Sequence, residues 1–311
     1  MLIIIAGPTA SGKSALALAL SRRLGGTVIN ADAMQCYREL RTLTARPTPE
    51  DEADAPHRLY GVRAAAEPAN AAWWRKAALA ELQTAETPIL CGGTGMYLSA
   101  LLNGLADIPD PGEAARTEAR ALLAEIGPAA LHERLMAVDP ETGTKIRPSD
   151  SQRLARAYEV WRGTGQGLAH WQSQPTQKLT GWTPRLILLD PSRDELKGAI
   201  ATRFHTMLAE NALAEVAALM ALNLDPALPL LRAHGVPELC AHLRGEISLP
   251  DAAARAILAT HQYTKRQATW FRHQHLVSTS AMHTIHARIA SKTQLSESLL
   301  MDMTNFIYSQ G

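Results

Sequence analysis

The sequence predicts an α/β protein in which a parallel sheet is flanked by helices and carries a helical insertion. Short apolar runs alternate with helical stretches in the first hundred residues, a glycine-rich loop joins the first pair, and a strand-free stretch interrupts the pattern after residue 107. Such alternation is typical of a parallel sheet covered on both faces. With 311 residues, 46% hydrophobic and 20% charged, the chain has the composition of an ordinary globular protein.

The first fifty residues indicate a βαβ unit. Leu2–Ala6 is a short apolar run rich in isoleucine, as expected for a buried parallel strand. Ala15–Leu24 is rich in alanine and leucine and predicts a helix, which Gly25 and Gly26 end. Thr27–Asn30 then predicts a second strand.

The next segments continue the alternation. Pro47–Asp54 is acidic and contains two prolines, which indicates an exposed loop. Ala71–Thr84 predicts a helix, Pro88–Cys91 a short buried strand, and Met96–Leu105 another helix.

A change of pattern near residue 108 predicts the domain organisation. From there to about residue 183 the chain is helical in character and shows no strong strand, and Arg185–Asp190 returns to the strand pattern. We therefore expect an α/β core of residues 1–107 and 184–311, with a helical C-terminal part, and a helical insertion of residues 108–183.

Charge and cysteine content narrow the class of protein. The net charge of +1 excludes a polycation, so any nucleic-acid site must come from local clustering of Lys and Arg. Cys36, Cys91 and Cys240 form no CxxC pair, which argues against a disulfide framework or structural zinc. The run Leu2–Ala6 is too short to span a membrane. We expect a cytoplasmic protein without membrane contact.

A phosphate-binding loop follows the first strand. It matches the pattern GxxxxGK[ST] between a strand and a helix, and so predicts a P-loop NTPase-like core that binds a di- or triphosphate. Lys13 supplies a mobile charge, and the Ser14 hydroxyl is placed to bind Mg²⁺. ATPases, small-molecule kinases and transferases with a diphosphate leaving group all remain open. The loop residues are Gly7, Pro8, Thr9, Ala10, Ser11, Gly12, Lys13 and Ser14.

An acidic residue stands where the second strand ends. Asp32 falls at the carboxyl edge of the sheet, where ligands bind in open α/β folds, and it can act as a general base. Gln35 offers both a donor and an acceptor to a base edge. The same stretch suits a helix N-cap equally well, because a Gln stands three residues after Asp32.

Five blocks, in order and covering nearly the whole chain, give the sequence a family resemblance. It resembles the bacterial-type tRNA dimethylallyltransferases, also called isopentenyltransferases. The blocks are Gly7–Ser14, Asn30–Arg38, Pro88–Tyr97, Arg147–Arg156 and Lys265–Arg272.

The resemblance implies a specific reaction. The loop would hold the diphosphate of dimethylallyl diphosphate, with Mg²⁺ as cofactor, and N6 of adenine 37 in the tRNA anticodon loop would attack the allylic carbon. Asp32 would take the amine proton, Thr94 would lie near the reacting amine or the diphosphate, and Arg203 would be a second cation on the diphosphate. By position alone, Arg203 suits a solvated helix charge better. We expect a monomer.

The resemblance also implies contacts with the tRNA anticodon stem-loop. Basic residues beside an aromatic one suit phosphate contact and base stacking. Taken alone, Arg153 and Arg156 suit a solvated helix face better, and Trp270 equally suits core packing. The implied tRNA-binding residues are Asp32, Ala33, Met34, Gln35, Thr94, Arg116, Gln152, Arg153, Leu154, Ala155, Arg156, Lys265, Arg266, Gln267, Trp270 and Arg272.

Some positions depart from the family pattern. Ala33 stands where a serine is usual, Gly235–Glu238 has Val-Pro where Tyr-(Lys/Arg) is usual, and His261 replaces an expected arginine. These changes weaken the expected tRNA contacts and leave the loop and Asp32 untouched. Two alternatives stay open: a P-loop kinase whose helical insertion is a lid, and a non-catalytic RNA-binding protein.

Overall fold

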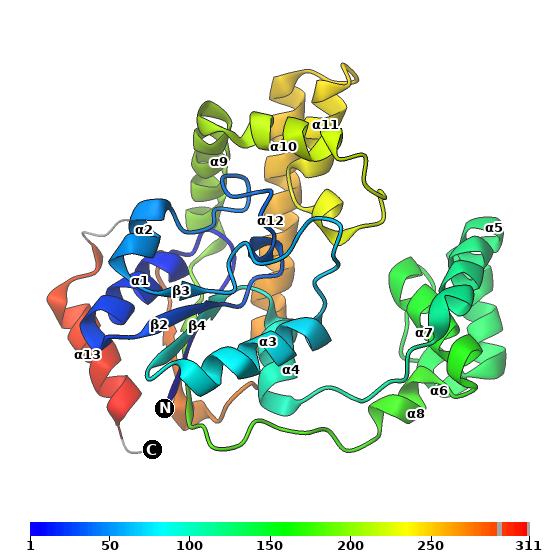
Figure 1. Cartoon of the computed structure of the whole chain (residues 1–311), viewed down its shortest axis with the longest axis horizontal. Coiled ribbons are helices and arrows are strands. Elements are labelled where there is room, and N and C mark those ends of the chain that lie inside the picture. The colour runs from blue at the N-terminus through cyan, green and yellow to red at the C-terminus, as the bar shows by residue number, and fades with distance from the viewer. Residues whose placement is uncertain (291–293, 310–311) are drawn as a thin grey trace. The chain divides into compact units, whose positions relative to one another are not determined.

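The computed structural model describes residues 1–290 and 294–309, and it confirms the predicted α/β class (Figure 1). Its strands form one six-stranded, fully parallel sheet in the order β3-β2-β4-β1-β5-β6. The strands are β1 (Leu2–Ala6), β2 (Thr27–Asn30), β3 (His57–Arg58), β4 (Pro88–Gly92), β5 (Pro184–Leu189) and β6 (Met282–Ile285).

The two faces of the sheet are covered by different helices. Alternate residues of β1 divide between two apolar clusters, because successive side chains in a strand point to opposite faces. Ile4 packs with side chains of α3 (Ala71–Thr84), α4 (Gly95–Asn103) and α12 (Leu249–His273). Ile5 packs with side chains of α1 (Lys13–Leu24) and α13 (Glu297–Tyr308).

A third apolar cluster holds the C-terminal helices together beyond the sheet. Buried residues of the Tyr37–Leu43 segment pack there against α-helical side chains, so the chain after Asp32 is anchored to these helices. The remaining elements of this region are the 3₁₀ helices η1 (Met34–Cys36), η2 (Pro229–Arg232) and η3 (Thr279–Ala281), and the helices α9 (Arg193–Glu210), α10 (Ala212–Ala221) and α11 (Val236–Leu243).

One predicted loop is a short helix. Residues 47–54 were expected to be an exposed loop, but Pro49–Asp54 forms α2. Its N-cap Thr48 accepts a hydrogen bond from the Asp51 amide, and the Asp51 carboxylate accepts one from the Thr48 amide. Proline at the first helical position supports the same start. The residues of this cap can be identified in the sequence, but the acidic composition favoured a loop.

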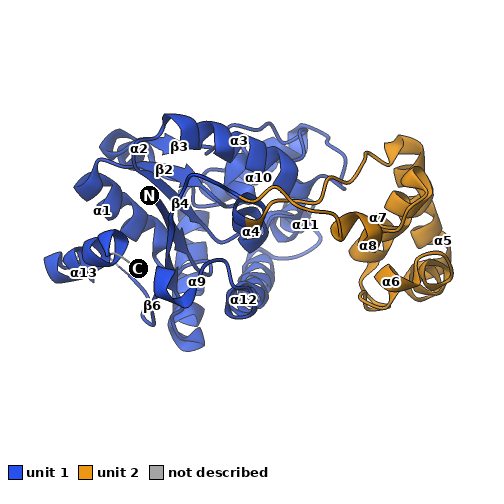
Figure 2. Cartoon of the chain, turned by 90° about the horizontal axis from the view of Figure 1, so that it is seen from below, with its two compact units in different colours: residues 1–102, 179–311 blue, residues 103–178 orange. Residues whose placement is uncertain are grey.

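The chain divides into two compact units (Figure 2). One comprises Met1–Leu102 and Leu179–Gly311, and the other comprises Asn103–Lys178, whereas the sequence predicted an insertion of residues 108–183. The Leu179 amide donates to the Leu102 carbonyl at 3.0 Å, so the core closes directly behind the excursion.

The smaller unit is helical and has its own apolar cluster. In this cluster α5 and α7 pack together around Leu131, Leu135 and Leu154. Its helices are α5 (Gly112–Val138), interrupted at Gly127 where φ is 76°, α6 (Pro140–Gly143), α7 (Ser151–Thr164) and α8 (Leu168–Gln172). Every helix in the described part of the chain is too short or too polar to cross a bilayer.

Candidate active site

The glycine-rich loop connects β1 to α1 and has the conformation that its glycines predict. Gly12 caps α1 with φ 96°, a value that disfavours other residues. At Gly7 an added Cβ would lie 2.6 Å from the Leu189 carbonyl oxygen, so the loop passes close to the end of β5. Ala10 also has a left-handed conformation, with φ 66°. The backbone is therefore bent into a tight turn at the N-terminus of α1.

A buried glutamine ties this loop to the end of β4. The Gln267 Oε1 atom accepts a hydrogen bond from the Thr9 amide at 2.9 Å, and Nε2 donates to the Gly93 carbonyl at 2.9 Å. The side chain is 4% exposed. The sequence predicted that Gln267 contacts tRNA. Both of its polar atoms make hydrogen bonds inside the protein, so Gln267 positions the loop, and its contact with tRNA stays a prediction.

Two cations and one carboxylate share the space beside the loop. Burial lowers the pKa of Lys13, whereas the nearby charge of Asp32 raises it and that of Arg203 lowers it further. Burial also lowers the pKa of Arg203, whereas the negative charge of Asp32 raises it. Arg203 therefore lies in the electrostatic neighbourhood of Lys13 and Asp32. The Lys13 Nζ atom also donates to the Pro8 carbonyl at 3.3 Å.

The sequence left open whether Asp32 caps a helix or lies at the ligand site, and its carboxylate does both. Its Oδ1 atom accepts a hydrogen bond from the Met34 amide at 3.0 Å, which supports the first turn of η1. The same side chain influences the pKa of both Lys13 and Arg203, so it lies near the loop as well. Asp32 thus supports the turn through one oxygen while remaining on the side of the phosphate-binding loop.

Asn30 fixes the backbone of Asp32 from below. Its side chain is fully buried, with Oδ1 accepting from the Asp32 amide at 2.8 Å and Nδ2 donating to the Asp32 carbonyl at 2.9 Å. Nδ2 also donates to the Leu59 carbonyl at 3.1 Å. Sequence reasoning did not single out Asn30 as a functional residue. A polar side chain at the end of an otherwise apolar strand was the available signal.

Thr94 links the ends of β2 and β4. Its Oγ1 atom accepts from the Ala33 amide at 3.0 Å, and its amide donates to the Ala31 carbonyl at 3.2 Å. Tyr263 on α12 joins this group. Burial and the charge of Asp32 raise the pKa of Tyr263 to about 12, while hydrogen bonds with Thr94 and Gln267 lower it. Tyr263 lies four residues before Gln267 on the same helix face, a spacing that could have revealed it.

Gln35 does not point freely toward a ligand. Its Nε2 atom donates to the Thr44 and Ala45 carbonyls, both at 2.9 Å. These two bonds use both of the protons that its amide can donate. The amide donors of Gln35 are thus used within the protein, and its contact with tRNA as donor or acceptor stays a prediction.

The surface of α12 supplies basic side chains and one packed aromatic residue. Lys265, Arg266 and Arg272 are exposed. The Arg266 guanidinium lies 5.6 Å from the Tyr263 ring centroid, and Arg272 Nε lies 3.8 Å from Asp190 Oδ2. Trp270 is half-buried in the apolar cluster that covers one sheet face, so its side chain serves core packing at least in part.

The smaller unit exposes two of its six predicted tRNA-binding residues fully to solvent. Arg153 is 74% exposed in its side chain and pairs with Asp150, and Gln152 is also exposed. Leu154 is fully buried in the apolar cluster, and its contact with tRNA stays a prediction. The remaining members are Arg116 and Arg156, which pair with acidic neighbours in the unit, and the half-buried Ala155.

The donor set beside the loop suits magnesium better than a metal held by a protein cage. In residues 1–290 and 294–309, no group of three or more His, Cys, Asp or Glu side chains could hold a metal. Ser14 is exposed in the first turn of α1. Mg²⁺ keeps several waters and binds substrate phosphates with few protein ligands, which such a position allows. Burial raises the pKa of neighbouring Cys91 to about 11, so its thiol is neutral at pH 7.

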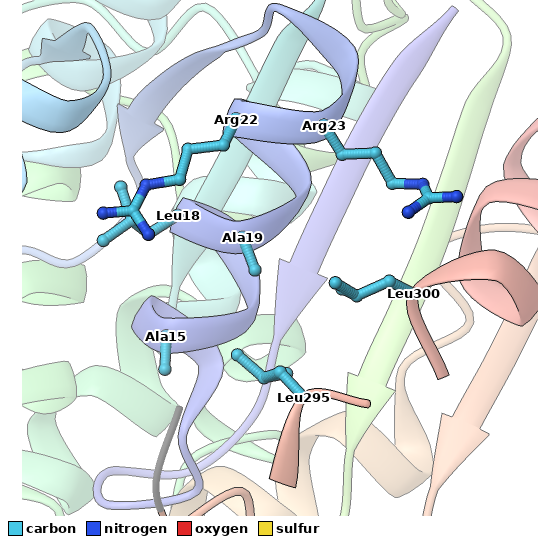
Figure 3. Close-up of a pocket in the computed structure, with 7 residues that line it drawn as sticks. All are labelled: Ala15, Leu18, Ala19, Arg22, Arg23, Leu295 and Leu300. Atoms are coloured by element: carbon cyan, nitrogen blue, oxygen red, sulfur yellow. The ribbon is translucent and has the colours of Figure 1, made fainter. Parts of the chain in front are cut away.

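A separate pocket lies along the outer side of α1 (Figure 3). Its lining combines small and apolar side chains with two arginines, and none of the residues predicted to bind phosphate contributes to it. The arginines pair with Asp54 and Glu297. This pocket is therefore no candidate for the phosphate site. Its lining residues are Ala15, Leu18, Ala19, Arg22, Arg23, Leu295 and Leu300.

Comparison with known proteins gives one consistent family. The family model described as IPP transferase matches residues 35–274. A tRNA dimethylallyltransferase from Acidiphilium cryptum (strain JF-5) is 65% identical, with the match covering 98% of this chain and 94% of that protein. One from Granulibacter bethesdensis is 60% identical, covering 98% and 97%. The crystal structure of the full-length tRNA isopentenylpyrophosphate transferase from Bacillus halodurans matches with a TM-score of 0.68 at 28% identity, covering 98% of this chain and 95% of that one.

Proposed function

The chain belongs to the IPP transferase family, and on that premise we propose that it transfers a dimethylallyl group from dimethylallyl diphosphate to N6 of adenine 37 in the anticodon loop of tRNA. The observation that carries the proposal is the shared neighbourhood of the phosphate-binding loop and a carboxylate. Thr94, beside Gly93, bonds to the amide that follows Asp32, and Gln267 joins Gly93 to the loop, so the Asp32 segment and the loop are held together. In agreement, the charge of Asp32 raises the pKa of Lys13, which begins α1. One site can therefore hold an anionic leaving group and accept a proton.

The donor binds through its diphosphate. Amide groups of the Gly7–Ser14 loop and the N-terminus of α1 attract phosphate oxygens, and Lys13 and Arg203 add full positive charges. Ser14 would contribute its hydroxyl to a bound Mg²⁺, which would neutralise charge on the departing diphosphate. The diphosphate leaves as the bond between the allylic carbon and oxygen breaks.

The acceptor, N6 of adenine 37, is activated by the carboxylate of Asp32. The lone pair of N6 is delocalised into the adenine ring, so the amine is a weak nucleophile. As the new bond between nitrogen and carbon forms, one N6 proton passes to Asp32, which acts as general base. Thr94 lies next to this carboxylate through its bond with the Ala33 amide, and we assign it to hold the reacting amine. The adenine must leave its stack to reach this position.

Basic residues of both units serve the tRNA backbone. We propose that the exposed Lys265, Arg266 and Arg272 on α12 contact phosphates, because such contacts supply most sequence-independent affinity. In the smaller unit, Arg116, Gln152, Arg153 and Arg156 take the same role. The family comparisons do not favour the P-loop kinase alternative.

We also propose that the enzyme works as a monomer in the cytoplasm. The groups assigned to the donor and to the proton transfer all come from one chain. Cys36, Cys91 and Cys240 are free thiols, which suits a reducing compartment.

The test of this function is incorporation of label. Purified protein is incubated with dimethylallyl diphosphate labelled in the prenyl group, Mg²⁺ and tRNA lacking modification at position 37. We expect the label in tRNA, and loss of that label when adenine 37 is replaced. Labelled tRNA in the replaced substrate, or no label in either, contradicts the proposal. A parallel incubation with ATP labelled in the γ-phosphate tests the kinase alternative.

A further inference from the structure

The segment after β6 lies directly on the phosphate-binding loop. The Ile289 amide donates to the Ser11 carbonyl at 3.0 Å, and Ile289 is 5% exposed. A Cβ added to Gly12 would lie 2.2 Å from the Ile289 carbonyl oxygen. Gly12 is therefore required both by its φ of 96° and by this contact. The segment around Ile289, which is distant in sequence, thus packs directly against the loop.

This segment carries an arginine beside the loop. The Arg288 Nε atom donates to the Ala10 carbonyl at 2.9 Å, and the Arg288 amide donates to Glu195 Oε1 at 3.2 Å. These bonds fix the backbone and the inner part of the guanidinium. In the described part of the chain, the two terminal nitrogens of Arg288 make no hydrogen bond or ion pair. They keep donors that suit phosphate oxygens in a paired, forked geometry.

Charge around the loop favours an anion there. The charge of Arg288 lowers the pKa of Arg203, so the two guanidinium groups lie close enough to repel each other. Lys13 adds a third positive charge in the same neighbourhood. The acidic groups nearby are Asp32 and Glu195, and Glu195 accepts hydrogen bonds from the Ser192 amide and hydroxyl as well as from Arg288. A diphosphate would relieve the repulsion among the cations.

We propose that Arg288 is a third cation of the diphosphate site, beside Lys13 and Arg203. The inference rests on the proposed function and adds a residue to its donor site. Arg288 reaches the loop from the C-terminal segment, holds the Ala10 carbonyl through Nε, and uses its terminal nitrogens on the donor phosphates. As the carbon–oxygen bond breaks, the charge that builds on the diphosphate is stabilised by this guanidinium.

The variant Arg288→Gln separates binding from packing. Glutamine places an N–H group at the position of Nε, so it can still donate to the Ala10 carbonyl while the positive charge is lost. We expect the affinity for inorganic diphosphate with Mg²⁺ to fall about tenfold or more, as expected for the loss of one charged hydrogen bond. Calorimetry on the full chain measures this affinity. The KM for dimethylallyl diphosphate rises in parallel, and tRNA affinity is unchanged.

Two controls make the outcome decisive. His286→Gln introduces the same residue at an exposed position in the same segment and leaves diphosphate binding unchanged. Thermal unfolding of both variants shows whether the segment stays in place. If Arg288→Gln folds like the wild type and binds diphosphate within about twofold of it, the inference is wrong. If wild-type protein binds diphosphate but fails to label tRNA, the proposed function fails while the inference stands.

Discussion

The phosphate side and the adenine side of the site are built in different ways. The phosphate side is centred on one run of consecutive residues, Gly7–Ser14, whose backbone forms the turn before α1, and Arg203 and Arg288 add charge from elsewhere in the chain. The adenine side is assembled from side chains that are distant in sequence, with Asp32 after β2, Thr94 after β4 and Tyr263 on α12. Local sequence therefore specifies the loop of the phosphate side, whereas the adenine side exists only after the sheet and α12 have packed.

The two sides are nevertheless connected through one side chain. Gln267 bonds to Thr9 on the phosphate side and to Gly93 beside Thr94. Because Gln267 lies on α12 and is buried, we expect the loss of its hydrogen bonds to affect the loop. Substitutions on either side, and in the link itself, test how separate the two functions are.

The largest expected effect comes from Asp32→Asn. Asparagine keeps an oxygen that can accept the Met34 amide, so the turn remains while the base is lost. We expect the single-turnover rate of prenyl transfer to fall about a hundredfold or more, with donor and tRNA binding retained. Asp32→Ala removes the turn contact as well, and comparison of the two variants measures that contact. A rate for Asp32→Asn within about tenfold of wild type would refute the general-base role.

The next effect, on the phosphate side alone, comes from Lys13→Met. We expect loss of the charge to weaken the binding of inorganic diphosphate about tenfold to a hundredfold, measured by calorimetry, because the charged hydrogen bond assigned from Lys13 to the diphosphate is removed. Binding of tRNA alone stays unchanged. Lys76→Met, at an exposed position on α3, is the matched control. Equal diphosphate affinities in the two variants would contradict this assignment.

A smaller effect, spread over both sides, is expected for Gln267→Met. Methionine has a similar volume but leaves the Thr9 amide and the Gly93 carbonyl without their partner, at about 1–3 kcal/mol for each buried group. Thermal unfolding should shift to lower temperature, and the KM for the donor should rise. Gln262→Met, exposed on the same helix, should change neither quantity. An unchanged donor KM in a destabilised Gln267→Met would show that the link does not reach the loop.

The smallest effect is expected on the smaller unit. Arg153→Ala should lower tRNA affinity a few-fold and reduce the dependence of log K on log salt by about 1, as expected for loss of one phosphate contact. Filter binding at several salt concentrations measures both. Arg162 lies about two and a half turns further along α7, on its opposite face, and Arg162→Ala is the control. Identical salt slopes for the two variants would exclude the assigned contact.

Much of the fold could be predicted because its signals are local. Leu2–Ala6 and Thr27–Asn30 are strands with the predicted bounds, since apolar runs beside glycine or polar residues specify them directly. β6 was not predicted, because Met282–Ile285 is half-exposed and includes a histidine, and only pairing with β5 makes it a strand. The α2 helix was not predicted because the acidic composition of residues 47–54 favoured a loop, whereas the capping box and the first-turn proline favour a helix.

The residues of the site divide in the same way, into those that local sequence predicts and those that depend on tertiary packing. The phosphate-binding loop has the predicted strand–loop–helix setting, whereas Asn30 and Tyr263 gain their place only from contacts with Asp32 and Thr94. Gln267 and Leu154 were assigned to tRNA from their motifs, whereas the structure buries both side chains. A motif names the residues of a site, but packing decides which of them face the ligand and which support it.

The most direct test of the common site is a structure of the ternary complex with tRNA and a non-reactive thiolodiphosphate analogue of the donor. We expect the diphosphate on the Gly7–Ser14 loop and adenine 37 turned out of its stack, with N6 within hydrogen-bonding distance of the Asp32 carboxylate. A diphosphate bound elsewhere, or an adenine that reaches the allylic carbon without approaching Asp32, would contradict this arrangement.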